Sequence, residues 1–307
     1  MLYSRPDIRT NQGTLKQPIH CVGYGLHSRE KVSMSLMQAP ANSGVHFLRR
    51  DIDIKRAIIP ASWHNLFDLH PYTVLINEYG VSISKVEPLL AALRGCGVDN
   101  VLIEVSAGEV PVLDGSSAPL VAMIQQAGID AQRAARQGIW IDHFVAVRCG
   151  EQYGFIRPGV VPEITVDGVI PDGEHKPQLL SLHLLDHVFE REIAPARNPE
   201  ADLEHGYDFI EAGNPNTAPV EAEPRFSDEF ARYRIQECLG FLALTEAPIC
   251  GQLYLYKPSR FLVDALLQEL YVARDTWRQI SYTEIDRLTG EITQTSAQKT
   301  PDRRRAG

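Results

Sequence analysis

Cysteine is scarce in this sequence of 307 residues. The five cysteines are scattered and odd in number, and no two of them have the C-x-x-C spacing. The sequence therefore excludes a disulfide framework and a cysteine-based structural zinc site, and buried free thiols are expected.

Long hydrophobic runs are also missing. Charge, proline or glycine interrupts each apolar stretch before about 18 residues, so no membrane span is predicted. Residues 1–10 contain Arg5, Asp7 and Arg9 and lack the apolar segment of a secretory signal. We therefore expect a cytoplasmic protein.

The sequence also lacks an excess of positive charge. The formal net charge is −9. Residues 1–150 hold 14 basic and 13 acidic side chains, whereas residues 151–307 hold 16 and 26. An acidic surface repels the phosphate backbone, so nucleic acid is not an expected partner. The sequence also lacks a P-loop, a dinucleotide-binding glycine motif and a G-x-S-x-G elbow, which excludes the enzyme classes that depend on them.

The composition that remains is that of a globular protein, with 44% hydrophobic and 22% charged residues. The length corresponds to about two domains. Strand-like alternation, capped helical segments and turn residues place an N-terminal domain at 14–137 and a C-terminal domain at 138–289. A disordered polar tail is predicted at 290–307.

Both halves show strands followed by helices, which predicts an α+β protein of two similar units. In the first half, a capping box at Ser84–Glu87 predicts the start of a helix that ends near Gly97. The Arg-rich segment 132–138 has a helical pattern. The remaining predicted helices cover 118–127, about 186–194, 227–244 and 259–273, and the clearest predicted strands cover 101–105, 152–157, 163–169, 178–184 and 252–257.

An acidic, proline-containing segment interrupts the second half. Residues 198–229 hold nine acidic side chains, one basic side chain and four prolines. Such a composition cannot bury much apolar surface, so we expect a mobile loop and a possible contact surface for a protein partner.

Several short motifs follow one another in a fixed order between residues 14 and 285. They are Gly23-Tyr-Gly-Leu-His-Ser28, Ser84-Lys-Val-Glu87, Gly97-Val-Asp-Asn100, Glu109-Val-Pro-Val-Leu-Asp-Gly-Ser116, Ala196-Arg197 and Asp228-Glu-Phe230. With these motifs the sequence resembles the UDP-3-O-acyl-N-acetylglucosamine deacetylases, the LpxC family of bacterial zinc enzymes in lipid A biosynthesis. The resemblance implies two α/β sandwich units, each a mostly antiparallel sheet, with helices packed between the two sheets.

The resemblance also implies where zinc chemistry would lie. The family binds zinc through the His of a V-E-H-L helix start and the His and Asp of an H-K-x-x-D helix. The Glu before the first ligand is the general base, and the His of a K-S-G-H turn is the acid. Such a site needs three protein ligands and an open position for water.

This sequence departs from that pattern. The base position is kept as Glu87, but Pro88 follows it and has no donor for a metal. Tyr233 and Glu237 occupy the other ligand positions, and a phenol is a poor substitute for imidazole. Arg260 replaces the acid and cannot release a proton near pH 7. We therefore expect no catalytic zinc and no cofactor, and Glu87 can equally be a helix-capping carboxylate.

Binding residues follow from the same comparison. His27 lies at a position that lines the family's pocket, and Arg234 stands where the family has Lys. Arg232, Arg234 and Arg260 could together hold a phosphate or carboxylate, or they could be solvated and paired with nearby acids. Pro88 is also expected to shift the helix start onto Glu87.

A metal site could have moved elsewhere in the chain. Two compact sets of His and Asp side chains are candidates, and surface or capping histidines are the competing interpretation. The two sets are His183, Asp186 and His187, and His64, Asp68 and His70.

Three functions are therefore open. The preferred hypothesis is a pseudoenzyme of the family, a non-catalytic binding, scaffold or regulatory protein whose cleft holds a small anionic ligand. The second is a metal-dependent amide hydrolase with altered ligands, which would need zinc. The third is a subunit of a larger complex that uses the acidic segment 198–229 as its contact surface.

Overall fold

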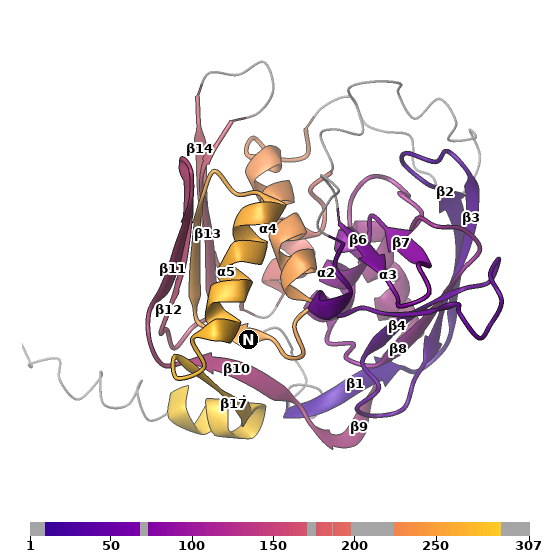
Figure 1. The fold of residues 1–307 in the computed structure, drawn as a ribbon, viewed down its shortest axis with the longest axis horizontal. Coiled ribbons are helices and arrows are strands. Elements are labelled where there is room, and N and C mark those ends of the chain that lie inside the picture. The colour runs from indigo at the N-terminus through magenta and orange to yellow at the C-terminus, as the bar shows by residue number, and fades with distance from the viewer. Residues whose placement is uncertain (1–9, 68–72, 171–175, 186, 198–223, 290–307) are drawn as a thin grey trace, which may run out of the picture.

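The computed structural model describes residues 10–67, 73–170, 176–185, 187–197 and 224–289. Two five-stranded sheets stand on opposite sides of the molecule, and the helices lie between them (Figure 1). Strands and helices alternate within each half, which confirms the predicted α+β class.

The first half is built on the sheet β2-β3-β8-β4-β5. The strands of this sheet are β2 (Ile19–Tyr24), β3 (Lys31–Gln38), β8 (Val101–Val105), β4 (Val45–Arg49) and β5 (Ile58–Pro60). Helices α2 (Glu87–Cys96) and α3 (Ala118–Ala127) cover its inner side. A hairpin of β6 (Val74–Ile76) and β7 (Ser82–Ser84) precedes α2, after a short turn η1 (Trp63–Asn65).

The second half repeats this arrangement with the sheet β11-β12-β16-β13-β14. The strands are β11 (Val145–Cys149), β12 (Gln152–Arg157), β16 (Gln252–Tyr256), β13 (Glu163–Val169) and β14 (Gln178–His183). Its helices are a single wide turn η2 (Phe189–Ile193), α4 (Glu229–Leu242) and α5 (Arg260–Val272).

The two large sheets have the same topology. In each sheet a strand that comes late in the half, β8 or β16, occupies the centre and pairs parallel with β4 or β13, respectively, while the other neighbours are antiparallel. Because both halves fold by the same strand order, the expectation of two similar units is confirmed although their sequences show no fixed repeat.

Two smaller sheets join the halves. Strand β9 (Ile129–Ala135) pairs with β1 (Asn11–Leu15), and β10 (Gln137–Ile141) pairs with β15 (Ile249–Cys250) and β17 (Trp277–Ser281). Only Arg136 separates β9 from β10, so one ribbon runs from the first half into the second. The predicted domain boundary between 137 and 138 falls inside β10.

The helical pattern predicted at 132–138 is wrong. These residues belong to β9 and β10, and their partners lie more than 100 positions away in sequence. Backbone pairing with β1 and β17 overrides the local preference, as long-range context commonly does.

At the start of α2, one expectation from the sequence is confirmed and another is wrong. The helix begins at Glu87 with Pro88 in its first turn, as the proline predicts. The capping box is not formed, because Ser84 ends β7 and its hydroxyl donates a hydrogen bond to the carbonyl of Gly108. Lys85 then turns the chain with a left-handed φ of 56°. At the other end, Gly97 closes the helix with a φ of 84°, as predicted.

The helix expected at 186–194 is shorter, because the turn η2 covers only Phe189–Ile193, and residue 186 lies outside the described residues. Strands β10 and β11 are separated by a turn in which the backbone N–H groups of Asp142 and His143 donate to the carbonyl of Thr276. Residues 198–223 of the acidic loop and the predicted tail also lie outside the described residues.

The hydrophobic core runs across both halves. Buried side chains of α2, such as Leu89 and Leu93, belong to the same cluster as Ile235 of α4 and Leu266 of α5. Helices α2 and α4 approach so closely that a Cβ on Gly240 would lie 2.2 Å from the carbonyl oxygen of Glu87. No helix among the described residues has the length and apolar character needed to cross a bilayer.

Candidate functional site

A cavity of about 210 Å³ lies where the start of α2 faces α4 and the start of α5. Both halves contribute to it. Its polar wall is formed by Thr73, Lys85, Glu87, Arg234, Glu237 and Arg260, and the rest of the wall by Cys238, Phe241, Pro258, Ser259, Phe261 and Val263. Four positions singled out in the sequence line this wall, namely Glu87, Arg234, Glu237 and Arg260, whereas Pro88 and Tyr233 do not.

Glu87 is buried at the first position of α2, with 9% of its surface exposed. One carboxylate oxygen, Oε1, accepts a hydrogen bond of 3.2 Å from the backbone N–H of Thr73. The other oxygen, Oε2, has no hydrogen-bond partner among the described residues. Pro88 does not line the cavity, and its carbonyl accepts a hydrogen bond from the hydroxyl of Ser117. Glu87 therefore directs a carboxylate to the cavity, with the helix N-terminus favouring its charge.

Helix α4 contributes an ion pair to the opposite wall. Nη1 of Arg234 lies 2.5 Å from Oε2 of Glu237, one helical turn further along. Tyr233, at the remaining ligand position of the family, is buried and does not line the cavity. Of the pair Tyr233 and Glu237, only Glu237 reaches the cavity, and an arginine already holds it.

Arg260 enters the cavity from the first turn of α5. Ser259 caps this helix, since its hydroxyl accepts a hydrogen bond from the N–H of Leu262. The guanidinium of Arg260 lies 4.4 Å from the centre of the Phe261 ring, a cation–π distance. The cavity thus has a permanent positive charge where the family resemblance places a proton donor.

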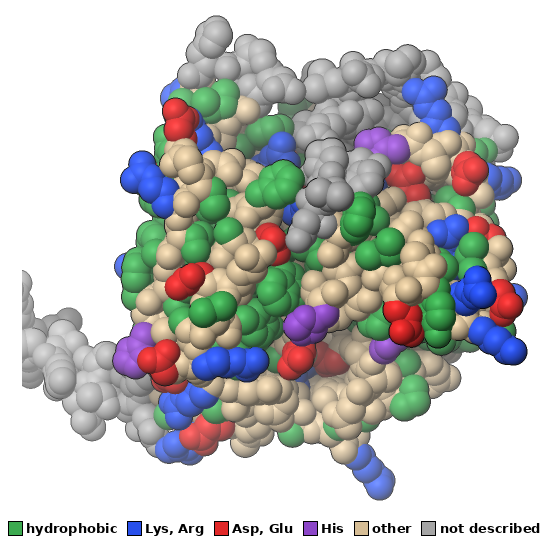
Figure 2. All heavy atoms as spheres, viewed as in Figure 1, with side chains coloured by type: hydrophobic (Ala, Val, Ile, Leu, Met, Phe, Trp, Pro, Cys, Tyr) green, Lys and Arg blue, Asp and Glu red, His purple; other side chains and the backbone are tan. Residues whose placement is uncertain are grey.

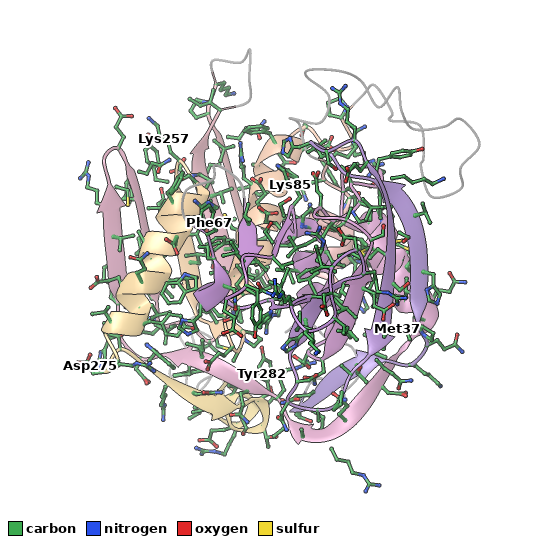
Figure 3. The ribbon with its side chains drawn as sticks, turned by 45° about the vertical axis from the view of Figure 1, so that its right-hand side comes forward. Met37, Phe67, Lys85, Lys257, Asp275 and Tyr282 are labelled. Carbon is green, nitrogen blue, oxygen red and sulfur yellow. The ribbon has the colours of Figure 1, made fainter. Side chains whose placement is uncertain are left out.

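The chain segments that lead into α2 and α5 each contain a non-glycine residue with a left-handed backbone conformation. Lys85 precedes α2 with a φ of 56°, and Lys257 precedes α5 with a φ of 50°. Both lysines lie toward the same end of the molecule (Figure 3). Non-glycine residues in this region are strained, and such strain is concentrated at functional sites.

The three arginines considered together in the sequence are not brought together. Arg232 points away from the cavity, where it binds Asp228 and Glu192 at 2.6 and 2.7 Å and covers the ring of Phe226. Arg234 and Arg260 are therefore the candidates for anion binding, with Arg234 also paired to Glu237, and Arg232 is the arginine that only pairs with nearby acids. On the face in Figure 2, charges of both signs are interspersed.

His27 lies elsewhere. Its side chain is exposed and does not line the cavity. The loop that carries it is fixed by Glu109, whose carboxylate accepts hydrogen bonds of 3.0 and 2.9 Å from the backbone N–H groups of His27 and Ser28. The glycine-rich turn around His27 therefore has a structural anchor in Glu109.

Cys238 is the thiol closest to this chemistry, since it lines the cavity. Burial raises its pKa to about 12, so it remains a neutral thiol at physiological pH. A neutral buried thiol is a poor nucleophile.

The two relocated metal sites each depend on residues outside the described ranges. Asp186, Asp68 and His70 are not described. Among their neighbours, His183 lies 3.3 Å from Glu163 and His187 lies 3.0 Å from Glu190, and all three described histidines are exposed. Within the described residues, no group of three or more His, Cys, Asp and Glu side chains is arranged to hold a metal ion.

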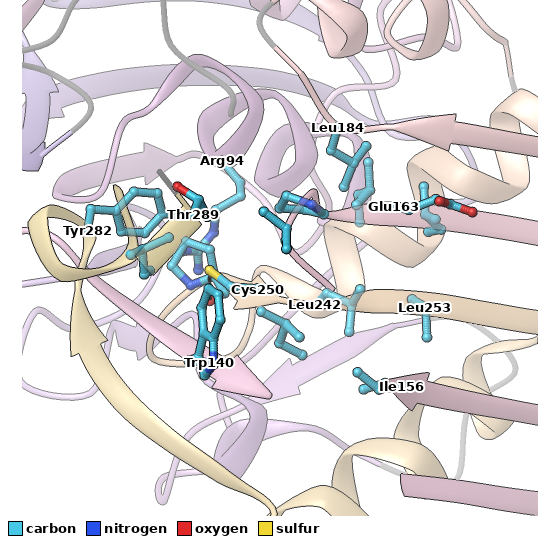
Figure 4. Close-up of a pocket in the computed structure, with 18 of the residues that line it drawn as sticks. Arg94, Trp140, Ile156, Glu163, Leu184, Leu242, Cys250, Leu253, Tyr282 and Thr289 are labelled. Atoms are coloured by element: carbon cyan, nitrogen blue, oxygen red, sulfur yellow. Dashed lines mark hydrogen bonds between the residues drawn. The ribbon is translucent and has the colours of Figure 1, made fainter. Parts of the chain in front are cut away.

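Sequence reasoning did not find two other cavities. A polar one of about 390 Å³ lies between the halves, and a mostly apolar one of about 90 Å³ lies beside α4 and β10. Arg94 borders both and donates hydrogen bonds to the carbonyls of Ala243 and Thr245; Figure 4 shows it beside Trp140 and Cys250 in the apolar cavity. The signal that could have found them is Arg94, which is placed within the otherwise apolar sequence of α2.

A family model for UDP-3-O-acyl N-acetylglycosamine deacetylase, LpxC, matches residues 12–204 of the chain. The chain belongs to the LpxC family. The match includes Glu87 and Pro88 and ends before α4 and α5, which carry the other half of the cavity wall. The LpxC resemblance seen in the sequence motifs is therefore confirmed.

Proposed function

We propose that this chain is a non-catalytic member of the LpxC family, whose cavity between α2, α4 and α5 binds a small anionic ligand in a regulatory or scaffold role. The observation that carries the proposal is the set of charged groups in that wall. Lys85, Arg234 and Arg260 surround it, and no histidine is found among the described residues that line it.

Electrostatics supports anion binding over zinc binding. A catalytic zinc site needs three ligands with donor atoms and a position for water. Glu237 is already paired with Arg234, and the fixed charge of Arg260 would repel a divalent cation from the same space. Guanidinium groups instead suit carboxylates and phosphates, which they bind through two parallel hydrogen bonds. A cytoplasmic role related to lipid A synthesis is part of the proposal because the resemblance implies it.

Metal content provides the test. We expect elemental mass spectrometry of protein purified without chelators to find far less than one equivalent of zinc. We also expect it to leave the family's acetylated amino-sugar nucleotide unchanged and to bind no zinc-directed hydroxamate. Orthophosphate and succinate should raise its melting temperature, and the increase should be lost in Arg260→Gln.

The alternative hydrolase predicts a different result. It has one observation in its favour, because Glu87 and Glu237 both line the cavity. One equivalent of tightly held zinc that disappears in Glu237→Ala, together with amide hydrolysis that depends on Glu87, would establish that function and contradict the proposal.

A further inference from the structure

Two acceptor atoms in the cavity wall lack a hydrogen-bond donor. These are Oε2 of Glu87 and the hydroxyl oxygen of Thr73, and neither has a partner among the described residues. Both residues line the cavity, and they are 9% and 1% exposed. Buried polar groups in folded proteins are almost always paired, so two neighbouring exceptions indicate where a ligand donates.

The charged groups around the cavity are of both signs. Beyond the Arg234–Glu237 pair, the described wall has the cations Lys85 and Arg260 and the carboxylate of Glu87. A ligand that is only an anion would place a negative charge beside the buried carboxylate of Glu87 and would offer no donor to its Oε2 atom. Burying a carboxylate without a partner is costly, whereas a cationic donor pairs with it.

We infer that the ligand of this cavity is a small amino acid or similar amine-bearing acid, whose ammonium group donates to Glu87 and Thr73 and whose acid group is bound by Arg260 and Lys85. This inference rests on the proposed anion-binding function. A cavity of about 210 Å³ fits a compact molecule of this kind. The ammonium has three donors, enough for both acceptors, and a charge opposite to that of Glu87.

Matched pairs of probes test the inference by isothermal titration of the full chain. Each pair has the same acid with and without an amine: β-alanine and propionate, 4-aminobutyrate and butyrate, phosphoethanolamine and ethyl phosphate. For at least one pair we expect the amine-bearing member to bind about tenfold or more tightly, since hydrogen bonds to charged groups are the strong ones. Equal affinity within every pair would overturn the inference while leaving the anion site intact.

Variants test which residues cause the preference for the amine-bearing probe. Glu87→Gln keeps an acceptor for the Thr73 N–H and removes the charge, so the preference for the amine should shrink to about threefold or less while the affinity for the plain acid stays or rises. Thr73→Val should weaken the amine-bearing member alone. Glu284→Gln makes the same change at a half-buried position outside the cavity and should bind both members like the unaltered protein.

The outcome also separates this inference from the proposed function. If neither member of any pair binds and Arg260→Gln changes nothing, both the anion site and the inference fail. If the acids bind and the preference survives Glu87→Gln, the anion site stands and the assignment of the ammonium to Glu87 is wrong.

Discussion

Glu229, the first residue of α4, shows how a single carboxylate anchors the second half of the chain. Its side chain lies 2.9 Å from Nε of Arg197 and also accepts hydrogen bonds from the backbone N–H groups of Arg197 and Arg225. Burial alone would raise the pKa of Glu229, but these hydrogen bonds outweigh it and hold the pKa below its ordinary value. The pair fixes the start of the helix that carries Arg234 and Glu237.

Removing this charge should change both stability and its dependence on pH. Because the pKa of Glu229 is lower in the folded chain, its stabilising contribution is complete above the unfolded value of about 4.3 and is lost as the pH falls through the folded value. We expect Glu229→Gln to lower the free energy of unfolding at pH 7 by about 3 kcal/mol, because the buried Arg197 loses its partner.

Urea unfolding between pH 7 and pH 3 measures this effect. The difference between the unaltered chain and Glu229→Gln should shrink toward the acidic end. Glu78→Gln, at an exposed loop position, serves as the control. A difference that stays constant over the whole range would show that the charge of Glu229 is not what stabilises the fold.

Glu87, Arg234, Glu237 and Arg260 were singled out in the sequence and line one cavity, and helix geometry explains why Arg232 does not. Arg232 and Arg234 are two positions apart on α4, so their side chains point in nearly opposite directions, and only Arg234 lines the cavity. The unpaired oxygens of Glu87 and Thr73 had no signal in the sequence. Whether a buried acceptor has a donor depends on atoms brought together by folding.

At the scale of elements, the close approach of α2 and α4 sets the geometry of the cavity. Gly240 packs directly on the backbone of Glu87, and an added Cβ would lie 2.2 Å from its carbonyl oxygen. We expect Gly240→Ala to push the helices apart, to lower the free energy of unfolding by about 2 kcal/mol and to weaken ligand binding through displacement of Glu87.

The matched control is Gly80→Ala, in the β6–β7 turn. A Cβ there meets nothing within 4 Å, and only its φ of 76° opposes the substitution, so a loss of about 1 kcal/mol and unchanged binding are expected. Chemical denaturation and titration with β-alanine measure both quantities. Equal losses in the two variants would mean that the helix contact has no special role.

A second prediction at this scale concerns the outer face of the second large sheet. Aromatic rings of β12 and β16 face each other across the strands: Phe155 and Tyr254 are 5.0 Å apart, as are Tyr153 and Tyr256. Such cross-strand pairs stabilise a sheet beyond the area they bury. A double-mutant cycle with Phe155→Ala and Tyr254→Ala should give a coupling of about 1 kcal/mol. Strict additivity of the two losses would contradict it.

The elements themselves show what a sequence can and cannot predict. Helix 118–127 and strands 101–105, 152–157 and 163–169 were predicted with their observed limits, because glycine, serine and strict alternation mark them locally. Strand β9 and the first residues of β10 were missed, because the Arg-rich segment 132–138 carries no alternating apolar pattern. Their pairing with β1 and β17 is decided by distant segments.

For the whole molecule, the shared core predicts that the two halves fold together. Leu89 and Leu93 of α2 are buried in the same cluster as Ile235 of α4. Trp63 of the first half donates a hydrogen bond of 2.7 Å to Asp264 of α5 and stacks on Tyr271. The two halves therefore share a topology, but the stability of each depends on contacts with the other.

A fragment of residues 10–137 should consequently fail to fold alone. It would expose the face of α2 that packs on α4, and burial of that apolar surface is a main source of its stability. Circular dichroism and urea titration should show no cooperative transition in the fragment and one transition in the full chain. A fragment with a sharp transition of its own would contradict this prediction.

The ribbon of β9 and β10 has a kinetic consequence. Arg136, at its midpoint, is 1% exposed, and its Nη2 atom lies 2.6 Å from Oδ2 of Asp99 in the turn after α2. With the strand held at this point and α2 packed against α4, we expect the two halves to move as one body. Stopped-flow association of β-alanine should then be a single exponential whose observed rate rises linearly with concentration, because no slow isomerisation precedes entry.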